Sequence, residues 1–155
     1  MLDLIIKNGK CYINGELKDV DVAVKDGKIH KIGQISEEAK ETLNAESQTV
    51  LPGCIDTQTH FREPGSTDTE DLHSGSRAAI VGGITSVFEM PNTNPPTSTK
   101  TEFQRKLDLA KNRMYCNYAF YFGATADNAG ELADLKNLEG CCGIKLFAGS
   151  STGNL

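Results

Sequence analysis

Features that mark several classes of protein are missing from this sequence. Basic residues are in deficit, with 16 Lys and Arg against 21 Asp and Glu. This balance argues against a nucleic-acid partner, because neutralising phosphates requires clustered cations. No hydrophobic run approaches the ~20 residues of a membrane span. The N-terminal MLDLIIKNGK also carries Asp3 where a signal peptide has basic residues. We therefore expect a cytoplasmic protein with neither a nucleic-acid nor a membrane partner.

The cysteines also lack any recognisable pattern. There are five of them, an odd number, and none stands in a CxxC or other metal-ligand spacing. We interpret them as free thiols in a reducing compartment. No internal repeat and no low-complexity stretch is present either.

Length sets a further limit on the fold. A chain of 155 residues with 38% hydrophobic side chains can bury a core of its own. It is too short for a complete (β/α)8 barrel, which needs ~250 residues or about 200 at the least.

Residues 1–50 have the pattern of a small β-domain. Runs rich in Ile and Val predict strands at Leu2–Ile6, Val20–Val24 and Ile29–Ile32. They are separated by Asn8-Gly9, Asn14-Gly15 and Asp26-Gly27, dipeptides that suit tight turns. A short helix with a thin apolar face is predicted over Ser36–Leu43.

Residues 51–155 alternate between the two kinds of periodicity. Strands are predicted over 51–60, 85–90, 117–122 and 143–147, and helices over 71–81, 100–113 and 128–138. Alternation of this kind is typical of right-handed βαβ units and a parallel sheet. The fold class is therefore α/β.

Polar side chains cluster where these strands end, which is where parallel α/β folds bind ligands. Each of them has an ordinary structural interpretation when taken alone, but together they indicate a site: Gln58, His60, Arg62, Asn92 and Lys145. Strand alternation places Asp56 on the same side as Gln58 and His60. A lysine in an apolar strand can lose its charge by burial and add to carbon dioxide or to a carbonyl.

Three segments carry a family resemblance: VLPGCIDTQTHFREPG, AAIVGGITSVFEMPNTNPPT and GIKLFAGSSTGNL. Together they resemble the first half of a dihydroorotase of the amidohydrolase superfamily. The resemblance implies about four strands of a (β/α)8 TIM barrel after a small β-domain, truncated after strand four. It also implies one or two Zn2+ ions and the cyclisation of N-carbamoyl-L-aspartate to dihydroorotate in pyrimidine biosynthesis.

The same resemblance implies a role for each site residue. His60 would be a metal ligand, and Lys145 would bind the metals as a carbamate. Arg62 and Asn92 would hold the substrate carboxylate. Gln58 stands where the family has its first histidine, and an amide is a poorer zinc ligand than imidazole. The family's catalytic aspartate and two further histidines would lie beyond Leu155, so the chain alone is expected to be inactive.

Other interpretations stay open at this stage. The protein could be a non-catalytic dihydroorotase-like scaffold for aspartate transcarbamoylase, or another cyclic amidohydrolase of the hydantoinase or allantoinase type. A Schiff-base lyase that uses Lys145 is a third alternative. The open strand edges of half a barrel also predict a homo-oligomer or a complementing C-terminal half.

Overall fold

The computed structural model describes residues 1–149 and 151, which fall into two compact units, Met1–Pro52 and Gly53–Leu155. We describe each unit by itself. Among the described residues, no helix is long and apolar enough to span a membrane.

The first unit is a β-sheet with the order β3-β2-β1-β4, and β5 also pairs with β1. Neighbouring strands are antiparallel except for β1 with β4 and β1 with β5, which are parallel. The strands are β1 (Leu2–Ile13), β2 (Glu16–Lys25), β3 (Lys28–Gly33), β4 (Ala39–Asn44) and β5 (Thr49–Val50).

Two of the three predicted turns of this unit are confirmed. Asn14-Gly15 joins β1 to β2 and Asp26-Gly27 joins β2 to β3, with positive φ at all four residues. That conformation suits the right-handed twist of a hairpin. The third prediction was wrong: Asn8-Gly9 lies within β1, at a register shift against β2. The positive φ of Asn8, 58°, makes a bulge there rather than a chain reversal.

The helix predicted over Ser36–Leu43 was also wrong. This segment leads into β4, which forms a parallel ladder with β1. Five of the six β4 residues are exposed, so this edge strand has almost no apolar pattern to distinguish it from a helix.

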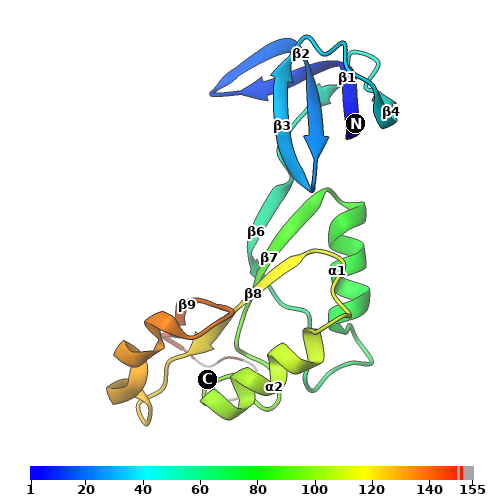
Figure 1. Ribbon diagram of the computed structural model, residues 1–155. Helices are drawn as coiled ribbons and strands as arrows, with labels where there is room; N and C mark the ends of the chain where they lie inside the picture. The colour runs from blue at the N-terminus through cyan, green and yellow to red at the C-terminus, as the bar shows by residue number, and fades with distance from the viewer. Residues whose placement is uncertain (150, 152–155) are drawn as a thin grey trace. The chain divides into compact units, whose positions relative to one another are not determined.

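The second unit alternates strands and helices, and the predicted parallel sheet is confirmed. The sheet has the order β6-β7-β8-β9 with every neighbouring pair parallel, and it curls as part of a barrel does. Helices α1 and α2 lie along one side of it (Figure 1). The elements are β6 (Cys54–Thr59), α1 (Leu72–Val81), β7 (Ile84–Glu89), α2 (Lys100–Ala110), β8 (Asn117–Gly123), the 3-10 helix η1 (Ala129–Asn137) and β9 (Cys141–Lys145).

The core of this unit lies between the sheet and the two α-helices. Val87, Phe103 and Phe120 are fully buried there. Helix α1 comes close to the end of β6 because Gly75 packs directly on the Phe61 ring, where a Cβ would lie 2.5 Å from a ring carbon. Thr99 caps α2 by accepting a hydrogen bond from the Glu102 amide. This packing fixes the strand ends that carry the site.

Candidate active site

His60 follows the end of β6, and its side chain is fixed by the loop after β7. His60 Nδ1 lies 2.9 Å from Asn92 Oδ1. Because an amide oxygen can only accept, this contact requires a proton on Nδ1, and a ring with its proton there offers the Nε2 lone pair to a ligand. Asn92 is buried and donates its own Nδ2–H to Ser151 Oγ at 3.1 Å. Two predicted site residues, His60 and Asn92, are therefore in direct contact.

Lys145 lies on the face of the sheet that the helices do not cover. Lys145 pairs with Gly123 of β8. The preceding residue of β8, Phe122, belongs to the core under the helices, so Gly123 and its partner Lys145 face the other way. His60 follows Thr59, which pairs with Glu89 on the helix-covered face. Alternation therefore places His60 on the same side as Lys145. Three strand spacings, about 14 Å along the sheet, separate β6 from β9, and the curl of the sheet shortens that span.

The predicted position of Asp56 was wrong. Asp56 pairs with Val87 and Thr59 with Glu89, so three residues of β6 match two of β7. This bulge puts Asp56 on the same face as Thr59, away from His60. Asp56 instead accepts a hydrogen bond from the Gln58 amide at 2.9 Å. Gln58 is exposed.

Arg62 is half-buried at the mouth of the site, in the left-handed region with φ 55°. Its conformation is held by its neighbour. Glu63 accepts from Arg113 at 2.8 and 3.1 Å and from the Leu72 amide at 2.9 Å. Among the described residues, the Arg62 side chain forms no hydrogen bond.

The FREPG and MPNTNPP segments pack on each other. Asn94 N–H donates to the Pro64 carbonyl at 3.0 Å. Gly65 has φ 120°, and a Cβ there would lie 2.8 Å from Asn94. Only glycine fits both the conformation and the close approach. These motifs therefore build the rim of the site.

Sequence reasoning missed an ion pair in the core beside the site. Glu89 ends β7 and contacts Lys106 of α2, and both side chains are fully buried. Burial raises the pKa of Glu89 to about 7, and the charges of Lys106 and Arg62 oppose that shift. Burial also lowers the pKa of Lys106. The sequence did contain one indication of this pair. Lys106 lies three residues after Phe103, so helical spacing places a charged side chain on the apolar face of α2.

The donor set fits part of a metal site. Within residues 1–149 and 151, no three histidine, cysteine, aspartate or glutamate side chains converge as metal ligands. His60 has the arrangement of a metal ligand, because a hydrogen bond to the other ring nitrogen fixes its orientation. With a carbamate on Lys145 it would give two ligands, short of the three that a catalytic zinc takes.

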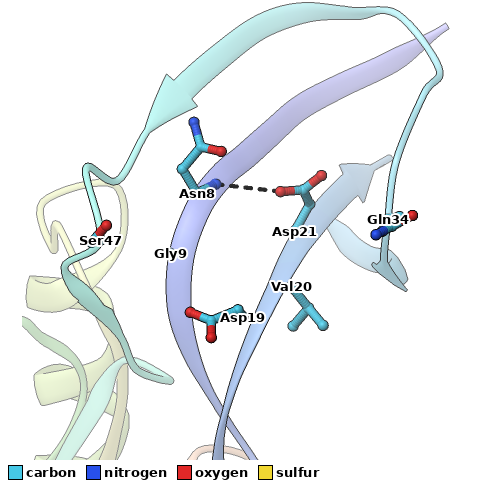
Figure 2. A pocket seen from close by; sticks show the side chains of 7 residues that line it. All are labelled: Asn8, Gly9, Asp19, Val20, Asp21, Gln34 and Ser47. Atoms are coloured by element: carbon cyan, nitrogen blue, oxygen red, sulfur yellow. Dashed lines mark hydrogen bonds between the residues drawn. The ribbon is translucent and has the colours of Figure 1, made fainter.

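The first unit contains a polar pocket of about 400 Å3 (Figure 2). Asp21 projects into it, but its carboxylate accepts from the backbone amides of Asn8 and Ile35, each at 3.3 Å. We assign this carboxylate a structural role, which holds the bulge of β1 and the segment after β3.

Comparisons with known proteins relate the chain to cyclic amidohydrolases. A sequence profile described as the amidohydrolase family matches residues 49–142. The allantoinase of Escherichia coli O1:K1 is 41% identical over 146 residues, 94% of this chain and 32% of its own length.

Solved structures give the same relationship. The L-hydantoinase of Arthrobacter aurescens matches with a TM-score of 0.89 at 31% identity, over 100% of this chain and 35% of its own. A D-hydantoinase from Thermus sp. matches with a TM-score of 0.69 at 26% identity, over 85% and 30%. The chain thus spans about a third of the length of these relatives. They are an allantoinase and hydantoinases, so they support the cyclic amidohydrolase alternative better than the dihydroorotase expectation.

Proposed function

This chain belongs to the amidohydrolase family, and from that membership we propose that it supplies the first four strands of a barrel that hydrolyses a cyclic ureide. The observation that carries the proposal is the pairing of His60 with Asn92 at the same strand edge and on the same side of the sheet as Lys145. An imidazole with one nitrogen held and the other available is what a catalytic metal needs from its first ligand.

The substrate class follows from the relatives. The names allantoinase and hydantoinase imply five-membered rings, and the two hydantoinases are also named dihydropyrimidinases, which implies six-membered rings. All of these rings share a cyclic N–CO–N–CO unit. We propose a ring of this class for the present protein. Dihydroorotate, which the sequence resemblance implies, carries an added carboxylate on a ring of this class, so it serves as the discriminating substrate.

Each site residue then has a role. His60 and a carbamate on Lys145 would hold Zn2+, with the Gln58 amide at the edge of the set. Bound zinc would lower the pKa of a water molecule and polarise the ring carbonyl. Asn92 orients His60, and the Arg62 guanidinium orients the polar ring through charge-assisted hydrogen bonds.

The test supplies the rest of a barrel from a relative. Residues 1–155 are fused to the remaining part of the Escherichia coli allantoinase and, separately, of the Arthrobacter aurescens L-hydantoinase. We expect zinc-dependent opening of allantoin or hydantoin and weaker turnover of dihydroorotate. His60→Ala and Lys145→Ala should each lower kcat by about 100-fold or more, while Lys136→Ala on the exposed face of η1 should not.

Two results would contradict the proposal. Full activity in the His60→Ala fusion would remove His60 from the site. A preference for dihydroorotate in both fusions would show that this chain carries the specificity of a dihydroorotase.

A further inference from the structure

The ion pair between Glu89 and Lys106 lies behind the loop that carries Asn92. Glu89 is the last residue of β7, and its neighbours in the sheet, Thr59 and Phe120, lie on the face toward the helices. Lys106 reaches it from α2, with its ammonium group 5.2 Å from the centre of the Phe120 ring. Both side chains are 0–1% exposed, so water solvates neither of them.

Lys106 has a second contact, and this one leads to the site. Its Nζ donates to the Met90 carbonyl oxygen at 3.0 Å. The Met90 amide in turn donates to the carbonyl of Thr59 at 2.9 Å. Met90 is thereby held from both sides, by α2 and by the end of β6. Two residues further along the chain, Asn92 accepts from His60, which directly follows Thr59.

Stability alone does not require a charged pair at this position. Replacing a buried ion pair by apolar side chains of similar volume is often neutral or stabilising. The surroundings, including Phe103 and Phe120, are apolar and would accommodate such a replacement. What an apolar pair could not supply is the N–H donor to the Met90 carbonyl.

We propose that Lys106, anchored by Glu89, is a positioning residue that sets the Met90–Asn92 segment and thereby the tautomer and orientation of His60. This role rests on the proposed function of His60. Glu89 keeps the ammonium group next to the Met90 carbonyl, and Asn92 then meets His60 Nδ1. A shift of the segment would leave Nδ1 without its acceptor, and the Nε2–H tautomer, which offers no lone pair on that nitrogen, would become populated.

The experiment reads the His60 ring directly by two-dimensional 1H–15N NMR of the 155-residue chain, which has three histidines to assign. In the unaltered chain we expect one tautomer, with the proton on Nδ1. The Glu89→Leu/Lys106→Met double variant removes both charges without leaving either one unpaired. We expect it to fold and to show His60 as a mixture of tautomers. Arg105→Met, which removes an exposed cation on the same helix, is the matched control and should leave His60 unchanged.

A second variant tests the proposal if the first variant does not fold. Glu89→Gln/Lys106→Gln keeps hydrogen-bonding groups at both positions and should restore part of the Nδ1–H preference. A folded double variant with the His60 tautomer of the unaltered chain would overturn the proposal. So would failure of both double variants to fold, because the pair would then serve folding itself.

Failure of the proposed function gives a different result. The tautomer measurement requires no turnover. If the fusions are inactive but Glu89→Leu/Lys106→Met still changes the His60 tautomer, the proposed hydrolase activity is rejected and the positioning role is kept. In an active fusion, the Glu89→Leu/Lys106→Met variant should lower kcat by about 10-fold or more with little change in KM, the range seen when partners that orient metal ligands are removed.

Discussion

Glu63 holds the rim of the site to the helices, and its removal is the sharpest test of the packing. Its carboxylate accepts two hydrogen bonds from Arg113 and one from the Leu72 amide at the start of α1. Glu63→Ala removes all three acceptors. Asp71, 3.6 Å from the Arg113 guanidinium, remains as a weaker partner.

The expected loss of stability depends on how well water can replace the Glu63 carboxylate as the acceptor for each donor. Breaking a fully buried ion pair costs ~3–5 kcal/mol. The Arg113 side chain is 34% exposed, so solvent screening reduces that figure to about 1–2 kcal/mol. The buried Leu72 amide loses its acceptor, which adds about 1–2 kcal/mol. We therefore expect a loss of about 3 kcal/mol in the free energy of unfolding, or at least ~10 °C in Tm for a unit of this size.

Urea and thermal unfolding followed by circular dichroism measure this loss. Asp68→Ala, an exposed carboxylate in the same loop, is the control and should change the free energy of unfolding by less than ~0.5 kcal/mol. Should Glu63→Ala be as stable as Asp68→Ala, Glu63 would not anchor the loop. The assigned conformation of Arg62 would then lose its support.

Two further predictions concern the core of the second unit. The pKa of Glu89 is about 7 in the folded state against 4.5 in the unfolded chain, so the folded state binds the extra proton between these values. The contribution of Glu89 to the free energy of unfolding should therefore fall by up to ~3 kcal/mol as pH rises from about 4.5 to 7. The nearby charges of Lys106 and Arg62 are already included in this pKa. Urea titrations across this range should show the fall in the unaltered chain and not in Glu89→Gln; parallel curves would reject the shift. Gly75→Ala places a Cβ 2.5 Å from the Phe61 ring and should cost about 1–3 kcal/mol in thermal unfolding, whereas Gly130→Ala meets no atom within 4 Å and should be neutral. Equal melting temperatures for these two variants would contradict the packing of α1 on Phe61.

Much of the second unit can be predicted from sequence because its local signals agree with one another. Helix α2 has a capping threonine and an apolar face, and the strands between the helices are rich in apolar residues. The first unit has weaker signals. Strand β4 is an exposed edge strand, and its pairing with β1 is decided by contacts about forty residues apart in sequence. Local periodicity carries no information on such contacts.

The sequence indicates which residues to group at the strand ends but not how they are arranged. His60, Asn92 and Lys145 follow from the rule that ligands bind at the carboxyl ends of parallel strands. The bulge that turns Asp56 away from His60 has no local signal, because Asp-Thr-Gln reads as ordinary alternation. The contact of Glu89 with Lys106 joins a strand to a helix that begins eleven residues later, so it depends on the packing of α2.

The residues of the FREPG motif make mostly structural contacts. In FREPG, Phe61 packs on α1, Glu63 binds Arg113, and Gly65 admits Asn94. Arg62 is the polar residue of this motif that we propose to meet a ligand. On that proposal the loop shapes the rim of the site and contributes little to the choice of ring. We therefore expect the choice of ring to depend mainly on the part of the barrel that a fusion partner supplies. Exchanging Arg62 alone should therefore change the KM of a fused enzyme more than its choice between a ureide and dihydroorotate.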